Sequence, residues 1–324
     1  MKQTLDTVLL LALPASGKSE VRRYLKSLDP EVCTTDFHLG PTVQLDDFPY
    51  VHMMRRIDDE LRRAGSPAMF FHAPDRPFQD ARDWGTLIQL LNEDYADLRA
   101  KKLAKPKSAA ELLLARIDAA RTKVGAKPVS PQLPNGLRTK VTDALEKEAR
   151  ELLDEKHASY PDTLQGKTLV IEFARGGPHG SSMPLPAPFG YAYSLAQLSP
   201  QILERATILY VWVTPEESRR KNEARANPND PGSILHHGVP HEVMMNDYGC
   251  DDMTHLIETS GKNGTIKLEA HGKTFHVPVA RFDNRVDKTS FVREDPKAWK
   301  KADVQALHAG LKGALTDLYR LAQR

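Results

Sequence analysis

The residues best suited to chemistry lie near the start of the chain, in the stretch VLLLALPASGKS that covers residues 8–19. A short apolar run leads into a turn, and a pattern with helical spacing follows. The stretch reads A-x-x-x-x-G-K-S, the phosphate-binding loop pattern with Ala12 in place of its first glycine. Backbone N–H groups of such a loop, with the N-terminus of the next helix, form an anion site. We therefore predict a nucleotide-phosphate site made of Leu13, Pro14, Ala15, Ser16, Gly17, Lys18 and Ser19.

Two side chains of this loop have expected roles of their own. Lys18 would place a positive charge between the β- and γ-phosphates, and the Ser19 hydroxyl would hold Mg²⁺. Ala12 departs from the pattern, because the first glycine often needs a backbone conformation that alanine disfavours. The alternative interpretation is a strand–turn–helix corner that contains Gly-Lys-Ser and binds nothing.

Composition and length are those of an ordinary globular protein. The chain has 324 residues, of which 40% are hydrophobic and 27% charged, so it can bury a sizeable core. A net charge of +2 gives no overall attraction to nucleic acid or membrane. Two cysteines, Cys33 and Cys250, are too few for a disulfide framework. The apolar run at residues 8–13 is short for a secretion signal and follows Asp6, so we expect a cytoplasmic protein that does not enter membranes.

Hydrophobic spacing predicts the elements that position the loop. Buried strands are expected at 168–174 and 206–213, where the apolar runs are nearly continuous. Shorter strands are expected at 31–37 and 68–71, and a hairpin at 267–279. Helices are expected at 18–28, 48–64, 81–103, 108–123, 136–157, 191–204, 215–226 and 296–322.

The alternation of strands and helices predicts an α/β fold with a doubly wound, mostly parallel sheet covered on both faces. Residues 104–164 differ in composition, being rich in Lys, Ala and Glu and carrying no motif. We expect them to form a helical insertion or lid subdomain. The core is then made of residues 1–103 and 165–324.

The order of loop, Asp-bearing second strand, strand with an internal acid and late Arg-rich helix resembles the P-loop kinases of the adenylate-kinase-like group, which includes nucleotide, nucleoside and polynucleotide kinases. The resemblance covers about residues 5–75 and 165–290, and the phosphate loop is its one specific motif. It implies a P-loop NTPase fold and the use of ATP and Mg²⁺. It also implies transfer of the γ-phosphate to an acceptor hydroxyl or phosphate, with a nucleoside or nucleotide as the first choice of acceptor.

The resemblance also implies roles for side chains outside the loop. An aspartate shortly after the first helix, here Asp36, would accept the acceptor's hydroxyl proton or orient the acceptor at the carboxyl edge of the sheet. Asp46 and Asp47 are weaker candidates for that role. A lid helix would bring arginines onto the transferring phosphoryl group. In this chain those arginines are Arg219, Arg220 and Arg225.

Two further residues are candidates for the nucleotide and the metal. Glu172 lies in an apolar strand and needs a partner, because a buried unpaired carboxylate is costly. We expect that partner to be Arg175 or the Mg²⁺ shell. Asn284 begins Asn284-Arg285-Val286-Asp287, which resembles the guanine-reading N-K-x-D pattern with Arg for Lys. The position suits a loop that contacts a nucleobase of either specificity, and the replacement of Lys by Arg weakens the match to the guanine-reading pattern.

Other functions stay open at this stage. A polynucleotide or a modified base in DNA is a second acceptor class, which the basic stretch Lys101–Lys107 favours slightly. A sugar-nucleotide is a third. A P-loop ATPase or switch without an acceptor is the alternative from another class. The sequence does not fix the oligomeric state.

Overall fold

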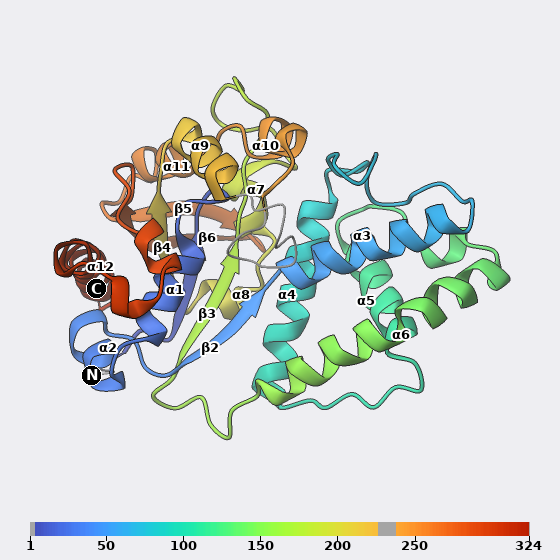
Figure 1. Cartoon of the computed structure of the whole chain (residues 1–324), viewed down its shortest axis with the longest axis horizontal. Helices are drawn as coiled ribbons and strands as arrows, with labels where there is room; N and C mark the ends of the chain where they lie inside the picture. Colours follow the sequence, from blue (N-terminus) through green and yellow to red (C-terminus); the bar gives the residue numbers. More distant parts are fainter. Residues whose placement is uncertain (1–3, 226–237, 324) are drawn as a thin grey trace.

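The computed structural model describes residues 4–225 and 238–323, and of Arg225 only the backbone (Figure 1). In this part of the chain six strands form one sheet, in the order β2-β3-β1-β4-β6-β5. All neighbours are parallel except β5 and β6, which form an antiparallel hairpin at one edge. The strands are β1 (Thr7–Leu11), β2 (Thr42–Asp46), β3 (Thr168–Phe173), β4 (Ala206–Trp212), β5 (Thr265–Ala270) and β6 (Lys273–Asp283).

The central strands are apolar on both sides, which is why helices cover both faces of the sheet. Side chains alternate between the faces along a strand. Val8 and Leu10 of β1 belong to one buried cluster, and Leu9 and Leu11 belong to another. This pattern confirms the expected mostly parallel, doubly covered α/β sheet.

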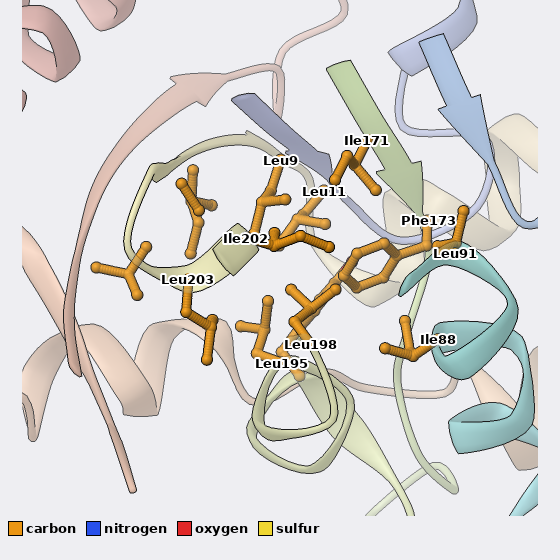
Figure 2. Close-up of a cluster of buried hydrophobic side chains, with 14 of the residues drawn as sticks. Leu9, Leu11, Ile88, Leu91, Ile171, Phe173, Leu195, Leu198, Ile202 and Leu203 are labelled. Atoms are coloured by element: carbon orange, nitrogen blue, oxygen red, sulfur yellow. The ribbon is translucent and has the colours of Figure 1, made fainter. Parts of the chain in front are cut away.

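Different helices pack on the two faces. One face is covered by α1 (Lys18–Lys26), α2 (Pro30–Phe37) and α12 (Lys301–Ala322). Figure 2 shows the cluster on the other face, where Leu9, Leu11, Ile171 and Phe173 meet Ile88, Leu91, Leu195, Leu198, Ile202 and Leu203. The helices on that face are α4 (Asp83–Ala100), α7 (Gly190–Ala196), α8 (Pro200–Leu203) and α11 (Met253–Glu258).

A helical layer lies beside the sheet (Figure 1, right). It consists of α3 (Phe48–Arg63), α5 (Ala109–Lys123) and α6 (Asn135–Ala158), together with the outer side of α4, and these share one buried cluster. The helices expected at 108–123 and 136–157 are thus confirmed as α5 and α6. Because α3 and α4 belong to the same cluster, the helical layer also includes residues from near 48 onward.

The remaining elements connect these layers. Helices α9 (Pro215–Arg225) and α10 (His241–Asp247) lie at the carboxyl edge of the sheet, above the strands in Figure 1. Short 3-10 turns occur at Ser130–Gln132, Ser290–Arg293 and Pro296–Ala298. None of the helices in the described ranges has the length and apolar character that crossing a bilayer requires.

The strand expected at 31–37 is wrong, because these residues form helix α2. The Asp29 side chain accepts a hydrogen bond from Glu31 N at 2.8 Å, and Pro30 occupies the first turn, a combination that starts a helix. The second strand is β2, formed by TVQLD at 42–46 with buried and exposed residues alternating. This period-two pattern was the available signal for it.

Two smaller expectations also differ from the structure. Residues 68–71 form no strand of the sheet, and only a single bridge joins Phe71 to Phe78. Asp58 replaces strand pairing there, since its carboxyl oxygens accept hydrogen bonds from the backbone N–H groups of Met69, Phe70 and Phe71. The helix expected at 191–204 is divided into α7 and α8 around Ser199 and Pro200.

Candidate functional site

The loop between β1 and α1 is fixed by hydrogen bonds to its carbonyl oxygens. Four carbonyl groups of the loop are engaged by side chains, three of which come from distant segments. With these carbonyl oxygens engaged inside the protein, an anion at this loop would be held by its N–H groups and the start of α1. The bonds are Tyr191 Oη to Ala12 O (2.9 Å), Ser16 Oγ to Leu13 O (2.6 Å), Ser218 Oγ to Pro14 O (2.7 Å) and Asn284 Nδ2 to Ser16 O (2.8 Å).

The backbone of the loop explains which of its residues must be small. Gly17 has a φ of 105°, and a Cβ there would lie 2.5 Å from Thr289 Oγ1 and 2.9 Å from Asn284 Nδ2. Ala15 has a left-handed φ of 56°. Ala12 is not among the residues with positive φ. The departure from the glycine pattern at Ala12 therefore causes no backbone strain, because the left-handed turn is placed at residue 15.

Lys18 and Ser19 form the first turn of α1 and line a cleft at the carboxyl edge of the sheet. The Lys18 ammonium donates a hydrogen bond to Ala12 O at 3.3 Å, which holds its side chain against the loop. Both residues are half-buried. The structure thus brings together the seven loop residues expected from the sequence, all of which line the cleft.

Two strand-end carboxylates stand beside the loop. Asp46 at the end of β2 is in register with Glu172 of β3, so the two acids are neighbours on parallel strands. Arg22 of α1 lies between them, with Nη1 2.5 Å from Glu172 Oε2 and 3.6 Å from Asp46 Oδ2. Of the two partners expected for Glu172, Arg175 is wrong, because the carboxylate pairs with Arg22; the Mg²⁺ shell stays a prediction. Glu172 and Asp46 both line the cleft.

The pKa of the Asp46 carboxyl is strongly shifted. Loss of water, followed by repulsion from Glu172 and Asp47, raises the pKa of Asp46 to about 7. Its Oδ1 accepts a hydrogen bond from Phe48 N at 2.8 Å, which fixes the carboxyl at the start of α3. The side chain remains 27% exposed, so a ligand in the cleft can reach it.

Asp47 has a structural partner instead. Its carboxyl lies 2.7 Å from Arg175 Nη1, and Arg175 is one of the most buried side chains of the described chain. Arg175 also donates to Ser194 Oγ and to the Trp84 carbonyl. The pair therefore ties β3 to α3, α4 and α7 at the floor of the cleft.

The structure places Asp36 away from this cleft. Asp36 lies on α2 and pairs with α12, with Oδ2 2.8 Å from His308 Nε2 and Oδ1 2.8 Å from Lys312 Nζ. It is not among the residues that line the cleft. The catalytic role expected for it depended on a strand end at residue 36, and that premise is wrong. The residue at the end of the second strand is Asp46.

Arg219 and Arg220 of α9 are likewise engaged elsewhere. Arg219 lies 3.0 Å from Glu216, and Arg220 lies 2.7 Å from Glu217, both within the same helix. Neither lines the cleft, and the Arg225 side chain lies outside the described residues. Helix α9 contacts the loop through Ser218 instead.

Asn284 holds the loop in place through hydrogen bonds of its side chain. Its Nδ2 donates to Ser16 O and to Thr289 Oγ1, and its Oδ1 accepts from Lys288 N at 2.7 Å. The side chain is fully buried. These contacts make Asn284 a positioning residue for the loop between β1 and α1, and they occupy the groups that a nucleobase would need.

The far end of the cleft is aromatic, and sequence reasoning missed it. The ring pairs lie at contact distance, with centroids 4.4 Å apart for Phe71 and Phe78, and 4.9 Å for Phe78 and Trp84. Only two charged side chains, Arg55 and Asp247, line this end in the described chain. The walls come from α3, the 70–80 loop, α4 and α10. They are Phe48, Val51, Phe71, Phe78, Trp84, Val239, Pro240, Val243 and Tyr248.

No group of three or more His, Cys, Asp or Glu side chains in the described ranges is arranged to hold a metal ion. Ser19 and Glu172 do line the same cleft, beside the N-terminus of α1. This set suits Mg²⁺, which keeps several waters and takes substrate phosphates with one or two protein oxygens.

Comparisons of the chain with protein-family models, characterised proteins and solved structures find no match.

Proposed function

We propose that the chain is an ATP- and Mg²⁺-dependent phosphotransferase of the P-loop kinase type, acting on a nucleoside or nucleotide acceptor. The observation that carries this proposal is a single cleft with two different ends. One end is a phosphate-type loop with lysine and acids, and the other is a walled aromatic pocket. A nucleotide-driven ATPase needs only the first end, whereas a kinase needs a site for an acceptor as well.

The loop residues Leu13 to Ser19 would hold the phosphates through backbone N–H groups, and Lys18 would add a positive charge. Phosphoryl transfer depends mainly on positioning and on stabilising charge, so few reactive groups are needed. The loop is suited to that task because its carbonyl oxygens are already engaged and need not rearrange.

Ser19 and Glu172 would hold the magnesium, Ser19 through its hydroxyl and Glu172 through bound water. When bound, the ion supplies neutralisation of charge on the phosphate oxygens. Arg22 keeps the Glu172 carboxylate in place, because the two side chains are 2.5 Å apart.

Asp46 would act as the general base. Its pKa of about 7 suits proton transfer at neutral pH, since an ionised fraction exists that still has affinity for a proton. The acceptor oxygen would lose its proton to the Asp46 carboxylate and form a bond to the γ-phosphorus. The bond between that phosphorus and the bridging oxygen breaks, and ADP leaves.

The decisive experiment is transfer of labelled γ-phosphate from ATP, with Mg²⁺, to pooled acceptors. The pools are nucleosides, nucleoside monophosphates, oligonucleotides and small hydroxylated metabolites. We expect label in the nucleoside or nucleotide pool and a loss of at least ~10³-fold in the Lys18→Ala variant. Lys26→Ala is the matched control, because Lys26 is exposed on the same helix, α1.

Two results would contradict the proposal. Label released only as free phosphate, equally with every pool, would indicate an ATPase without an acceptor. Equal transfer by the wild type and by a folded Lys18→Ala variant would mean that the loop is not the phosphate site. Label in the oligonucleotide pool alone would support kinase activity but would identify the acceptor as a nucleic acid.

A further inference from the structure

The aromatic end of the cleft contains a buried acid whose carboxyl is only partly compensated by its neighbours. Asp247, the last residue of α10, is only 4% exposed, yet it lines the cleft. No hydrogen bond of full geometry to its carboxyl oxygens is recorded among the described residues, and the Trp84 indole N–H is the donor that comes close to them. Burial raises the pKa of Asp247 to about 7, against the opposing charge of Arg55. A buried carboxyl in this state needs hydrogen bonds that the protein itself does not supply.

Two unused donors face the same space. The Trp84 indole N–H is buried and has no hydrogen-bond partner in the described chain. It lies close enough to Asp247 to lower the pKa of that carboxyl, but not in hydrogen-bonding geometry with it. Arg55 stacks on Phe71 at 3.9 Å, and its one recorded hydrogen bond within the described ranges is from Nη1 to Pro74 O. Its other N–H groups therefore remain for a ligand.

These groups define the ligand by complementarity. The ring walls favour a flat, aromatic molecule, because stacking against aromatic side chains requires a planar partner. An ionised carboxylate accepts hydrogen bonds from two neighbouring N–H groups of a ligand, and the free donors of Arg55 and Trp84 need an acceptor beside them. The ligand edge must therefore offer two adjacent donors next to an acceptor.

We propose that the acceptor is a guanine nucleoside or nucleotide, and that Asp247 selects it by accepting hydrogen bonds from the N1–H and 2-amino groups of the base. The O6 atom then faces the donors of Arg55 and Trp84. Among the common bases, guanine alone presents this order of donor, donor and acceptor on one edge. The base lies at the aromatic end, and the sugar hydroxyl extends toward Asp46 and the phosphate loop.

This inference rests on the proposed phosphotransferase but can be tested separately from it. Equilibrium dialysis without ATP measures binding of guanosine, adenosine, cytidine and uridine to the wild-type protein. We expect guanosine to bind more tightly than the other three by on the order of 10- to 100-fold, the range for one bidentate base contact. The Lys18→Ala protein should bind guanosine as the wild type does, since Lys18 lies at the other end of the cleft.

The Asp247→Asn variant tests the direction of the hydrogen bonds. An asparagine has one acceptor and one donor, so it opposes the 2-amino group of guanine but matches xanthine, which carries an oxygen at that position. We expect preference to change from guanosine to xanthosine, which a purely structural role would not produce. Glu242→Gln is the matched control, because it removes a carboxylate from α10 that pairs with Arg76 at 3.0 Å and is half exposed.

The outcomes separate the two proposals. Equal binding of the four nucleosides, or an Asp247→Asn variant that is folded and keeps its preference for guanosine, overturns the base assignment even if phosphate is transferred. Selective guanosine binding with the expected change of preference supports the assignment. Selective guanosine binding without any phosphate transfer from ATP would support the guanine site and contradict the proposed phosphotransferase activity. Circular dichroism and thermal unfolding of each variant establish that it is folded.

Discussion

The two ends of the cleft differ in the parts of the chain that form them: backbone at one end and side chains at the other. The loop end consists of one continuous stretch from Leu13 to Ser19, whose backbone would hold the ligand. The aromatic end is made of side chains from four separate segments, among them α3 and α10. A backbone site needs few particular side chains but needs a fixed path, whereas a side-chain site needs the helical layer to be in place. Substitutions that abolish binding at the aromatic end should therefore leave binding at the loop end intact. The following predictions test this separation.

The largest effect is expected from Asp46→Asn, which should lower turnover by about 10²–10⁴-fold while the affinity for ATP stays unchanged. The residue lies between the two ends and would act only on the transferred proton. Steady-state kinetics and ATP binding by calorimetry measure the two quantities. Unchanged turnover would assign the base to another carboxylate, with Asp47 the nearest in sequence.

The pH dependence of activity and of stability gives a second test of Asp46. If Asp46 is the base, wild-type kcat/KM should fall about tenfold per pH unit below pH 7, because the protonated carboxyl cannot accept a proton. The pKa of Asp46 in the folded state lies above the unfolded value of about 3.9, so the ionised carboxyl destabilises the fold increasingly as the pH rises from about 4 to 7. Asp46→Asn should therefore raise the melting temperature more at pH 8 than at pH 5.

The next effect is expected at the aromatic end alone. Asp58 is fully buried and holds the backbone of residues 69–71, so Asp58→Ala should cost about 3 kcal/mol or more by leaving three N–H groups unpaired. The acceptor KM should rise while ATP affinity is retained. Denaturant unfolding and nucleotide titration measure the two.

Asp59→Ala is the control for Asp58, since Asp59 is a neighbouring acid that is 40% exposed and pairs with Arg62 at the surface. If Asp58→Ala weakened ATP binding as much as acceptor binding, the two ends would not act separately.

The smallest effect is expected for Asp36→Asn, which should leave turnover within about twofold. The hydrogen bonds of Lys312 and His308 lower the pKa of Asp36, so the ion pair stabilises the fold at neutral pH and is lost as the pH falls below about 3.9. Such a partly exposed pair is worth about 1 kcal/mol or less. A large loss of turnover in this variant would restore Asp36 to the mechanism.

The difference between the two ends also explains how far sequence reasoning reached. The loop, the buried strands β3 and β4 and most helices were predictable, because each depends on residues close together in the chain. Asp36 was favoured over Asp46 because residues 31–37 were expected to form a strand, whereas Asp29-Pro30 starts a helix there. The partner of Glu172 was not predictable, since Arg22 is 150 positions away and meets it only through the packing of α1 on the sheet.

The space around Gly17 has a consequence for how this chain can change over generations. Thr289 and Asn284, more than 260 positions further on, fill the volume that any side chain at position 17 would need. A library randomised at residue 17 should return glycine alone, and one randomised at residues 17 and 289 together should still favour glycine, because the φ of 105° and the Asn284 contact remain. The glycine that sequence motifs treat as a local property of the loop is thus maintained twice, by its own backbone conformation and by contacts from residues far along the chain.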